Sequence, residues 1–143
     1  MDLESMASEL LHFMETLPRR APQNWLGEFS RGELFLLNYL YVNGAVSPGA
    51  MRDALQTSTA RIAAALNSLE RKGWINREPD DGDHRRKLVH LTPSGIEHIQ
   101  DYRNKALQSI TGLLTELGQE DAAEYLRITR RMALISRDFD FDI

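Results

Sequence analysis

The side chains best able to do chemistry in this sequence are basic ones gathered in its middle third. Residues 52–87 hold eight arginines and lysines and six acidic residues. By contrast, residues 1–51 hold three basic and six acidic residues, and residues 88–143 hold six basic and nine acidic residues. Guanidinium groups bind phosphates and the edges of nucleotide bases. The chain has a net charge of −4 but contains a mildly basic segment, which would favour binding to a nucleic acid. Such a cluster of charges is also typical of a helix face that is simply exposed to solvent.

The composition argues against several other kinds of chemistry. The 143 residues include no cysteine, which excludes a disulfide framework, a cysteine-ligated zinc site and a thiol nucleophile. The four histidines do not stand at metal-ligand spacing, and no nucleophile–base pair or glycine-rich phosphate loop is visible. We therefore expect no metal, no cofactor and no enzymatic activity. No apolar run approaches the roughly 18 residues of a membrane span, so a cytoplasmic protein without a membrane partner is expected.

The basic segment must be positioned by two short helices, which are predicted over 48–55 and 58–72. Ser47 and Pro48 are a typical N-cap and first helical residue, and Gly73 is a typical residue after a helix end. The second helix has one apolar face, formed by Ile62, Leu66 and Leu69. Two short helices joined by a tight turn predict a helix-turn-helix, in which the second helix is the one that contacts DNA.

After these helices the apolar pattern changes from a helical period to alternation. Strands are predicted over 74–78 and 87–91, and the segment 79–86 between them contains an Asp-Gly turn signal. A hairpin that directly follows a helix-turn-helix is a wing.

Amphipathic helices are expected on both sides of this lobe. Apolar residues recur at helical spacing over 3–17, and a further helix is expected from Ser30, where Glu33 would complete a capping box. Beyond the wing, helices are predicted over 93–117 and 119–137. Because these stripes are too long to be buried on one small lobe, we expect them to form the interface of a homodimer.

The predicted fold is thus mainly α with a small β-wing, a winged helix-turn-helix with helical dimerisation arms. The DNA-binding lobe is expected over residues 30–95. The dimerisation region is expected over residues 1–29 and 96–143.

Two motifs in this order resemble those of the MarR family of bacterial transcription regulators. The segment 83–95, DHRRKLVHLTPSG, is similar to the family's wing, which carries Asp-x-Arg and then a strand closed by Leu-Thr-x-x-Gly. The segment 66–75, LNSLERKGWI, is similar to the end of its recognition helix. The resemblance implies a homodimer on a pseudo-palindromic site in double-stranded DNA, usually as a repressor. It also implies, for many members, release by a small anionic or phenolic ligand in a cleft between the dimer helices and the DNA lobe.

The recognition helix offers small and polar side chains for DNA contact. Ala64 would let the helix backbone approach the major groove, and Arg61 lies near the end of the helix where base contacts are usual. Arg61 has a simpler alternative role as a solvated arginine, and the hydroxyl residues have one as helix caps. The candidate DNA contacts on this helix are Thr57, Ser58, Thr59, Arg61, Ala64, Asn67, Ser68 and Arg71.

In the wing, the resemblance assigns Arg85 to insertion into the minor groove, with Asp83 orienting its guanidinium. Arg86 is the second candidate for this insertion, and an ordinary surface ion pair is the alternative. The site of the possible small-molecule effector is not defined by the sequence. Trp25 is a candidate for lining it, and packing against the dimer helices is its simpler alternative role.

A second function remains open on the sequence alone. The winged helix could contact another protein without sequence-specific DNA binding, with the acidic ends as partner surfaces. Loss of Arg61 or Arg85 would then leave function intact.

Overall fold

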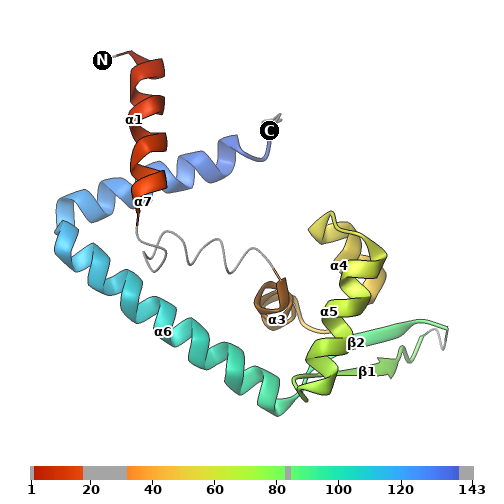
Figure 1. Cartoon of the computed structure of the whole chain (residues 1–143). Helices are drawn as coiled ribbons and strands as arrows, with labels where there is room; N and C mark the ends of the chain where they lie inside the picture. The colour runs from red at the N-terminus through yellow and green to blue at the C-terminus, as the bar shows by residue number, and fades with distance from the viewer. Residues whose placement is uncertain (1, 18–31, 83–84, 139–143) are drawn as a thin grey trace. The chain divides into compact units, whose positions relative to one another are not determined.

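The computed structural model describes residues 2–17, 32–82 and 85–138. It confirms a mainly helical chain with one small antiparallel hairpin, in which each helix and strand follows the predicted order (Figure 1). The elements are α1 (Leu3–Thr16), α3 (Gly32–Asn43), α4 (Pro48–Leu55), α5 (Thr59–Arg71), β1 (Ile75–Pro79), β2 (Lys87–Leu91), α6 (Pro93–Leu117) and α7 (Gln119–Ile135). Two compact units divide the chain, Met1–Arg103 and Asn104–Ile143. Three expectations, those for Trp25, Ser30 and Asp83, lie outside the described residues.

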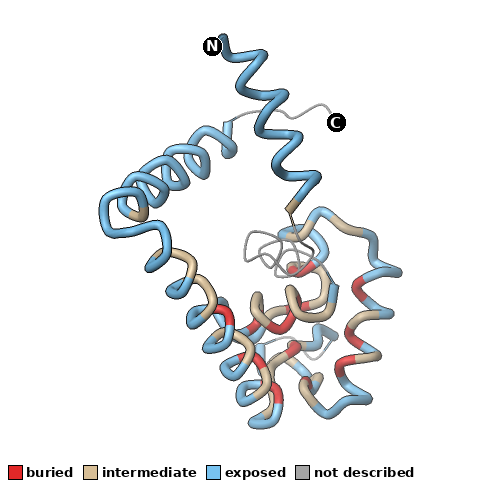
Figure 2. Tube along the Cα trace, turned by 60° about the vertical axis from the view of Figure 1, so that its left-hand side comes forward, coloured by how far each residue is buried: buried red, intermediate tan, exposed pale blue. Residues whose placement is uncertain are grey.

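The core of the first unit is formed by α3, α4, α5, the hairpin and the first turns of α6 (Figure 2). The apolar face predicted for the recognition helix is confirmed, because Ile62, Leu66 and Leu69 are all buried. The remaining buried core residues are Leu36, Leu37, Leu40, Met51, Ile75, Val89 and Ile99. This packing fixes which face of α5 is left to solvent.

Local caps set the ends of α4 and α5. The hydroxyl of Ser47 accepts the amide of Ala50 at 3.1 Å, and the hydroxyl of Ser58 accepts the amide of Arg61 at 3.2 Å. Between the two helices Gln56 adopts a left-handed conformation, with φ 48° and ψ 46°. The turn therefore reverses the chain within a few residues, as a helix-turn-helix requires.

The hairpin is anchored to the helices by more than its own strands. Its register pairs Ile75 with Leu91 and Pro79 with Lys87. In addition Val46, just before α4, forms an antiparallel bridge with Val89, with N–H···O distances of 3.1 and 2.7 Å. The sequence did not predict this third segment of pairing. It matters because an isolated two-stranded hairpin is only marginally stable in water.

Thr92 joins the hairpin to the start of α6. Its hydroxyl donates to the carbonyl of Gly73 at 2.6 Å and accepts the amide of Gly95 at 3.1 Å, while its own amide donates to the carbonyl of Trp74 at 3.0 Å. The Trp74 ring stacks on His98, with 3.9 Å between ring centroids. Both ends of the wing are therefore tied to one another and to α6.

The helices outside the lobe expose their apolar side chains. No residue of α1 or of α7 is buried in this single chain (Figure 2). Leu3 is 83% exposed and Met14 61%, values far above those of core residues. Among the helices described here, none is both long enough and apolar enough to cross a membrane.

Candidate nucleic-acid interface

The outward face of α5 carries small and polar side chains that are exposed to solvent. Because Ile62, Leu66 and Leu69 point into the core, the helical period turns Ala64 and Arg71 to solvent, and both are exposed. Their side chains leave the middle of the helix accessible to a bulky partner. This arrangement matches the predicted approach of a helix backbone to a groove about 12 Å wide.

The first turn of α5 shows two different uses of its hydroxyl groups. Ser58 is the N-cap and Thr59 accepts a hydrogen bond from Arg52 at 3.4 Å, whereas Thr57 is half-buried. Arg61 lies in the same first turn and is exposed, and its guanidinium forms no hydrogen bond or ion pair with any residue of the described ranges. Ser58 therefore caps the helix, while the Arg61 side chain extends from it into solvent.

Asn67 lies on the outward face but contacts the wing. Its side-chain oxygen accepts a hydrogen bond from Nη2 of Arg77 at 2.7 Å. Nε of Arg77 lies 3.0 Å from a carboxylate oxygen of Glu70, one turn further along α5. The recognition helix and β1 are thus clamped together by a guanidinium that the sequence did not single out.

Ser68 faces α3 and not the outward surface. It forms a hydrogen bond with the carboxylate of Glu33, which also accepts one from Nζ of Lys72 at 2.5 Å. Glu33 thus links α3 to the end of α5, whereas the capping box expected with Ser30 lies outside the described residues. The bond from Lys72, more than that from Ser68, holds the pKa of Glu33 below its ordinary value of 4.5.

Replacing Glu33 by glutamine is expected to lower the free energy of unfolding by under about 1 kcal/mol at neutral pH, because this ion pair is partly exposed. A lowered carboxyl pKa means that the contribution is complete above pH 4.5 and is lost as the pH falls through the folded-state value. Urea denaturation of both proteins from about pH 7 to about pH 3 measures the difference. A difference that does not shrink at low pH would contradict the ionic origin.

The wing arginines have distinct surroundings. Nη2 of Arg86 donates to the hydroxyl of Ser47 at 3.1 Å, so this guanidinium lies against the N-cap of α4. Arg85 is exposed at the residue before it. The turn itself is held by the amide of Asp80, which donates to the carbonyl of Arg86 at 2.8 Å. Arg86 therefore joins the wing to α4.

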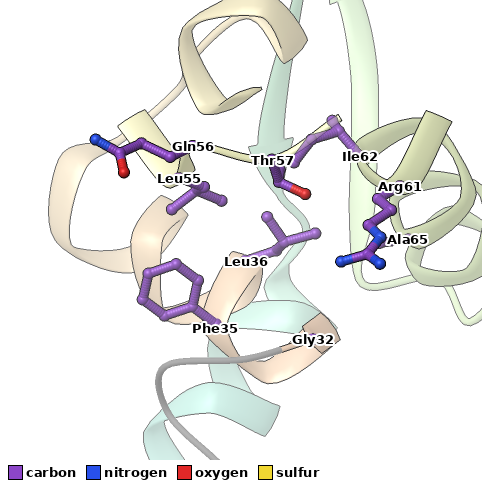
Figure 3. Close-up of a pocket in the computed structure, with 9 residues that line it drawn as sticks. All are labelled: Gly32, Phe35, Leu36, Leu55, Gln56, Thr57, Arg61, Ile62 and Ala65. Carbon is purple, nitrogen blue, oxygen red and sulfur yellow. The ribbon is translucent and has the colours of Figure 1, made fainter. Parts of the chain in front are cut away.

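A pocket of about 460 Å³ opens beside the first turns of α5. Figure 3 shows Phe35 and Arg61 on opposite sides of it, with Leu36 of α3 between them. Leu55 at the end of α4 and Thr57 in the turn that follows also line it. The pocket thus combines apolar walls with one guanidinium. In the described part of the chain, no three histidine or acidic residues are grouped to hold a metal ion.

Comparison with known proteins identifies the chain. The family model described as MarR family matches residues 28–86. The HTH-type transcriptional regulator YdgG of Bacillus subtilis, itself uncharacterized, is 30% identical over 121 residues, which cover 83% of this chain and 80% of that protein. The transcriptional repressor MprA of Escherichia coli is 26% identical over 90 residues, 63% of this chain and 51% of that protein.

The fold agrees with these sequence matches. The crystal structure of MepR, a transcription regulator of the Staphylococcus aureus multidrug efflux pump MepA, superposes with a TM-score of 0.67 at 25% identity and covers 95% of this chain and 98% of that one. The similarity to YdgG extends over most of both chains, and the winged helix-turn-helix is present in the structure. The chain belongs to the MarR family of DNA-binding transcription regulators.

Proposed function

We propose that this regulator is a homodimeric repressor that binds a pseudo-palindromic DNA site. The observation that carries the proposal is the outward face of α5, where small residues lie beside Arg61, whose guanidinium has no partner among the described residues. The DNA-binding lobe is residues 30–95, and the dimerisation region is residues 1–29 and 96–143. The repressor role is supported by the similarity to MprA, which is named as a transcriptional repressor.

Dimerisation is supported by the apolar side chains that the single chain leaves in solvent. Scattered exposed apolar residues are ordinary, but a concentration of them on helices with no buried residue marks an interaction surface. On α1 and α7 these side chains are Leu3, Met6, Leu10, Leu11, Phe13, Met14, Tyr125, Leu126, Ile128, Met132, Leu134 and Ile135. A two-fold dimer presents two recognition helices, and two half-sites related by the same symmetry follow.

The proposed contacts rest on the chemistry and the exposure of each side chain. Arg61 is assigned to a base edge, where a guanidinium can donate two parallel hydrogen bonds to guanine. Arg71, Thr57 and Thr59 are assigned to phosphates, and the wing arginine Arg85 to the minor groove. Ser58, Ser68 and Arg86 keep the internal hydrogen bonds described above, and so act by holding α5 and the wing in place.

Effector release is the second part of the proposal. The pocket beside α5 has apolar walls and ends at Arg61, which is the chemistry that binds a small aromatic carboxylate. A ligand that pairs with this guanidinium would compete directly with DNA for it. The pocket therefore supplies a physical link between binding of the effector and loss of the operator.

The test is a DNA-binding titration at several salt concentrations. The protein first selects its own site from a random duplex library, and a shuffled duplex of the same composition is the control. Affinity for the selected site is expected to fall by about 10³-fold between about 50 and 200 mM salt, since each neutralised phosphate releases counterions. Sedimentation should give a dimer in the same buffers, and benzoate should lower the affinity.

Failure to enrich any sequence, or a salt dependence that is nearly flat, would contradict the proposal. The alternative, a winged helix that contacts only protein, would then be favoured.

A further inference from the structure

The amide of Asn67 is held by the wing on one side. Nη2 of Arg77 donates to its oxygen at 2.7 Å, and Glu70 pairs with the same guanidinium at 3.0 Å. The Arg77 side chain is 26% exposed, whereas that of Glu70 is 50% exposed. Arg77 is therefore enclosed between β1 and α5, and its charge is matched within the protein.

The chemistry of this contact fixes the orientation of the amide. A guanidinium has hydrogen-bond donors and no acceptor, so Asn67 must present its oxygen, and not its nitrogen, to Arg77. The NH₂ group then lies on the other side of the amide. Asn67 is exposed and stands between Ala64 and Arg71 on the outward face of α5. The group that it can offer to a partner of this face is the NH₂ donor.

We infer that Arg77 makes Asn67 a donor-only group, and so determines which base Asn67 selects. The inference rests on the proposed function, in which α5 enters the major groove. An asparagine normally reads adenine through two bonds, in which its nitrogen donates to N7 and its oxygen accepts from N6. Because Arg77 holds the oxygen through one of its two lone pairs and turns the NH₂ group outward, this two-point contact is disfavoured. The remaining donor suits the two acceptors of guanine and the O4 of thymine, reaches only N7 of adenine, and is mismatched with the amino group of cytosine.

Arg77 is a positioning residue in this scheme, because it acts on DNA only through Asn67. Its guanidinium donates one hydrogen bond to Asn67 and lies in ion-pair contact with Glu70, while its buried Nε has no hydrogen-bond partner among the described residues. Base preference at one position of each half-site therefore depends on a residue in the wing that lies beside, and not in, the recognition helix.

The experiment is selection from a random duplex library with the full-length protein and with Asn67→Asp. Aspartate has the same shape and keeps an oxygen on Arg77, but its outward atom is an acceptor. One position in each half-site is expected to change from guanine or thymine to cytosine. Affinity for the original site is expected to fall about 30-fold or more, because the homodimer meets the mismatched base in both half-sites.

Asn76→Asp is the matched control. It makes the same chemical change and the same change of charge on the neighbouring residue of β1, which alternation places on the opposite face of the hairpin. We expect a small loss of affinity for all duplexes and no change in the preferred base. A change of base at the same position in this control would contradict the inference.

Arg77→Met is a second, independent test, because it removes the hydrogen bond that Arg77 donates to the oxygen of Asn67. Adenine is expected to become the preferred base at the same position, and a merely structural role of Arg77 would not produce this change. A thermal unfolding midpoint measured beside it shows whether the wing is still folded. If the wing of the Arg77→Met variant is not folded, the inference is judged by the base preference of Asn67→Asp alone.

The inference is overturned if Asn67→Asp weakens all duplexes equally and leaves the consensus unchanged, because Asn67 would then contact a phosphate or no DNA. If the unaltered protein enriches no sequence, the proposed function itself fails. The two failures are thus separated by the result with the unaltered protein.

Discussion

Arg61→Ala is expected to weaken binding to the selected operator by about 30-fold or more. A guanidinium that donates to guanine contributes roughly 1–3 kcal/mol per half-site, and a homodimer loses the contact twice, so the total is about 2 kcal/mol or more. Arg61 is exposed and has no side-chain partner within the described residues, so little effect on stability is expected. Fluorescence anisotropy with the selected and the shuffled duplex measures the loss of specificity.

Arg61→Lys separates a base contact from a phosphate contact. Lysine keeps the positive charge but lacks the planar pair of donors, so binding to the shuffled duplex should persist while preference for the operator falls. If alanine lowers the affinity for both duplexes by the same factor, Arg61 contacts phosphate. If it changes neither affinity, Arg61 is not part of the interface.

Gly95→Ala is expected to lower the free energy of unfolding by about 3 kcal/mol, the upper end of the usual range for overpacking. A Cβ at this position would lie 2.0 Å from the carbonyl oxygen of Trp74 and 2.9 Å from its carbonyl carbon. This backbone cannot easily withdraw, because the Trp74 carbonyl accepts the amide of Thr92 at 3.0 Å. Urea denaturation at fixed protein concentration is the measurement, since dimerisation makes apparent stability concentration-dependent.

Gly49→Ala is the control for this change. Gly49 also lies in the first turn of a helix, but the nearest heavy atom to a Cβ at this position would be the flexible end of Arg52, 3.9 Å away. Alanine here is expected to stabilise the protein by up to about 1 kcal/mol through helix propensity. If Gly95→Ala and Gly49→Ala changed the free energy of unfolding by similar amounts, the start of α6 would have to accommodate the added methyl group by shifting.

The elements of the lobe were predictable because their ends are encoded locally. Ser47 and Ser58 cap α4 and α5 as expected, and α6 begins at Pro93. The first strand differs from the prediction by one residue at each end. Its last residue is Pro79, which pairs with Lys87 and which sequence reasoning placed in the turn. A proline is tolerated at such an edge because it need not donate to a neighbouring strand.

The partners of the site residues were not predictable in the same way. The period of α5 correctly identifies its outward face, but it cannot show that Ser68 meets Glu33 or that Asn67 meets Arg77. These pairs depend on how α5 packs against α3 and against the hairpin. Arg86 and Ser47 are 39 positions apart, so no local pattern links them. Sequence reasoning therefore finds the surface more readily than the contacts that orient its side chains.

The bridge between Val46 and Val89 also has a consequence for the order of folding. The hairpin of β1 and β2 closes a short loop, a step that takes microseconds in small systems. The bridge joins segments far apart in the sequence and must wait for a much longer loop to close, at a higher entropic cost. Because the hairpin alone is only marginally stable, we expect it to persist only once the start of α4 has docked on it, so that the wing and the helix-turn-helix reach their final arrangement together and late in folding.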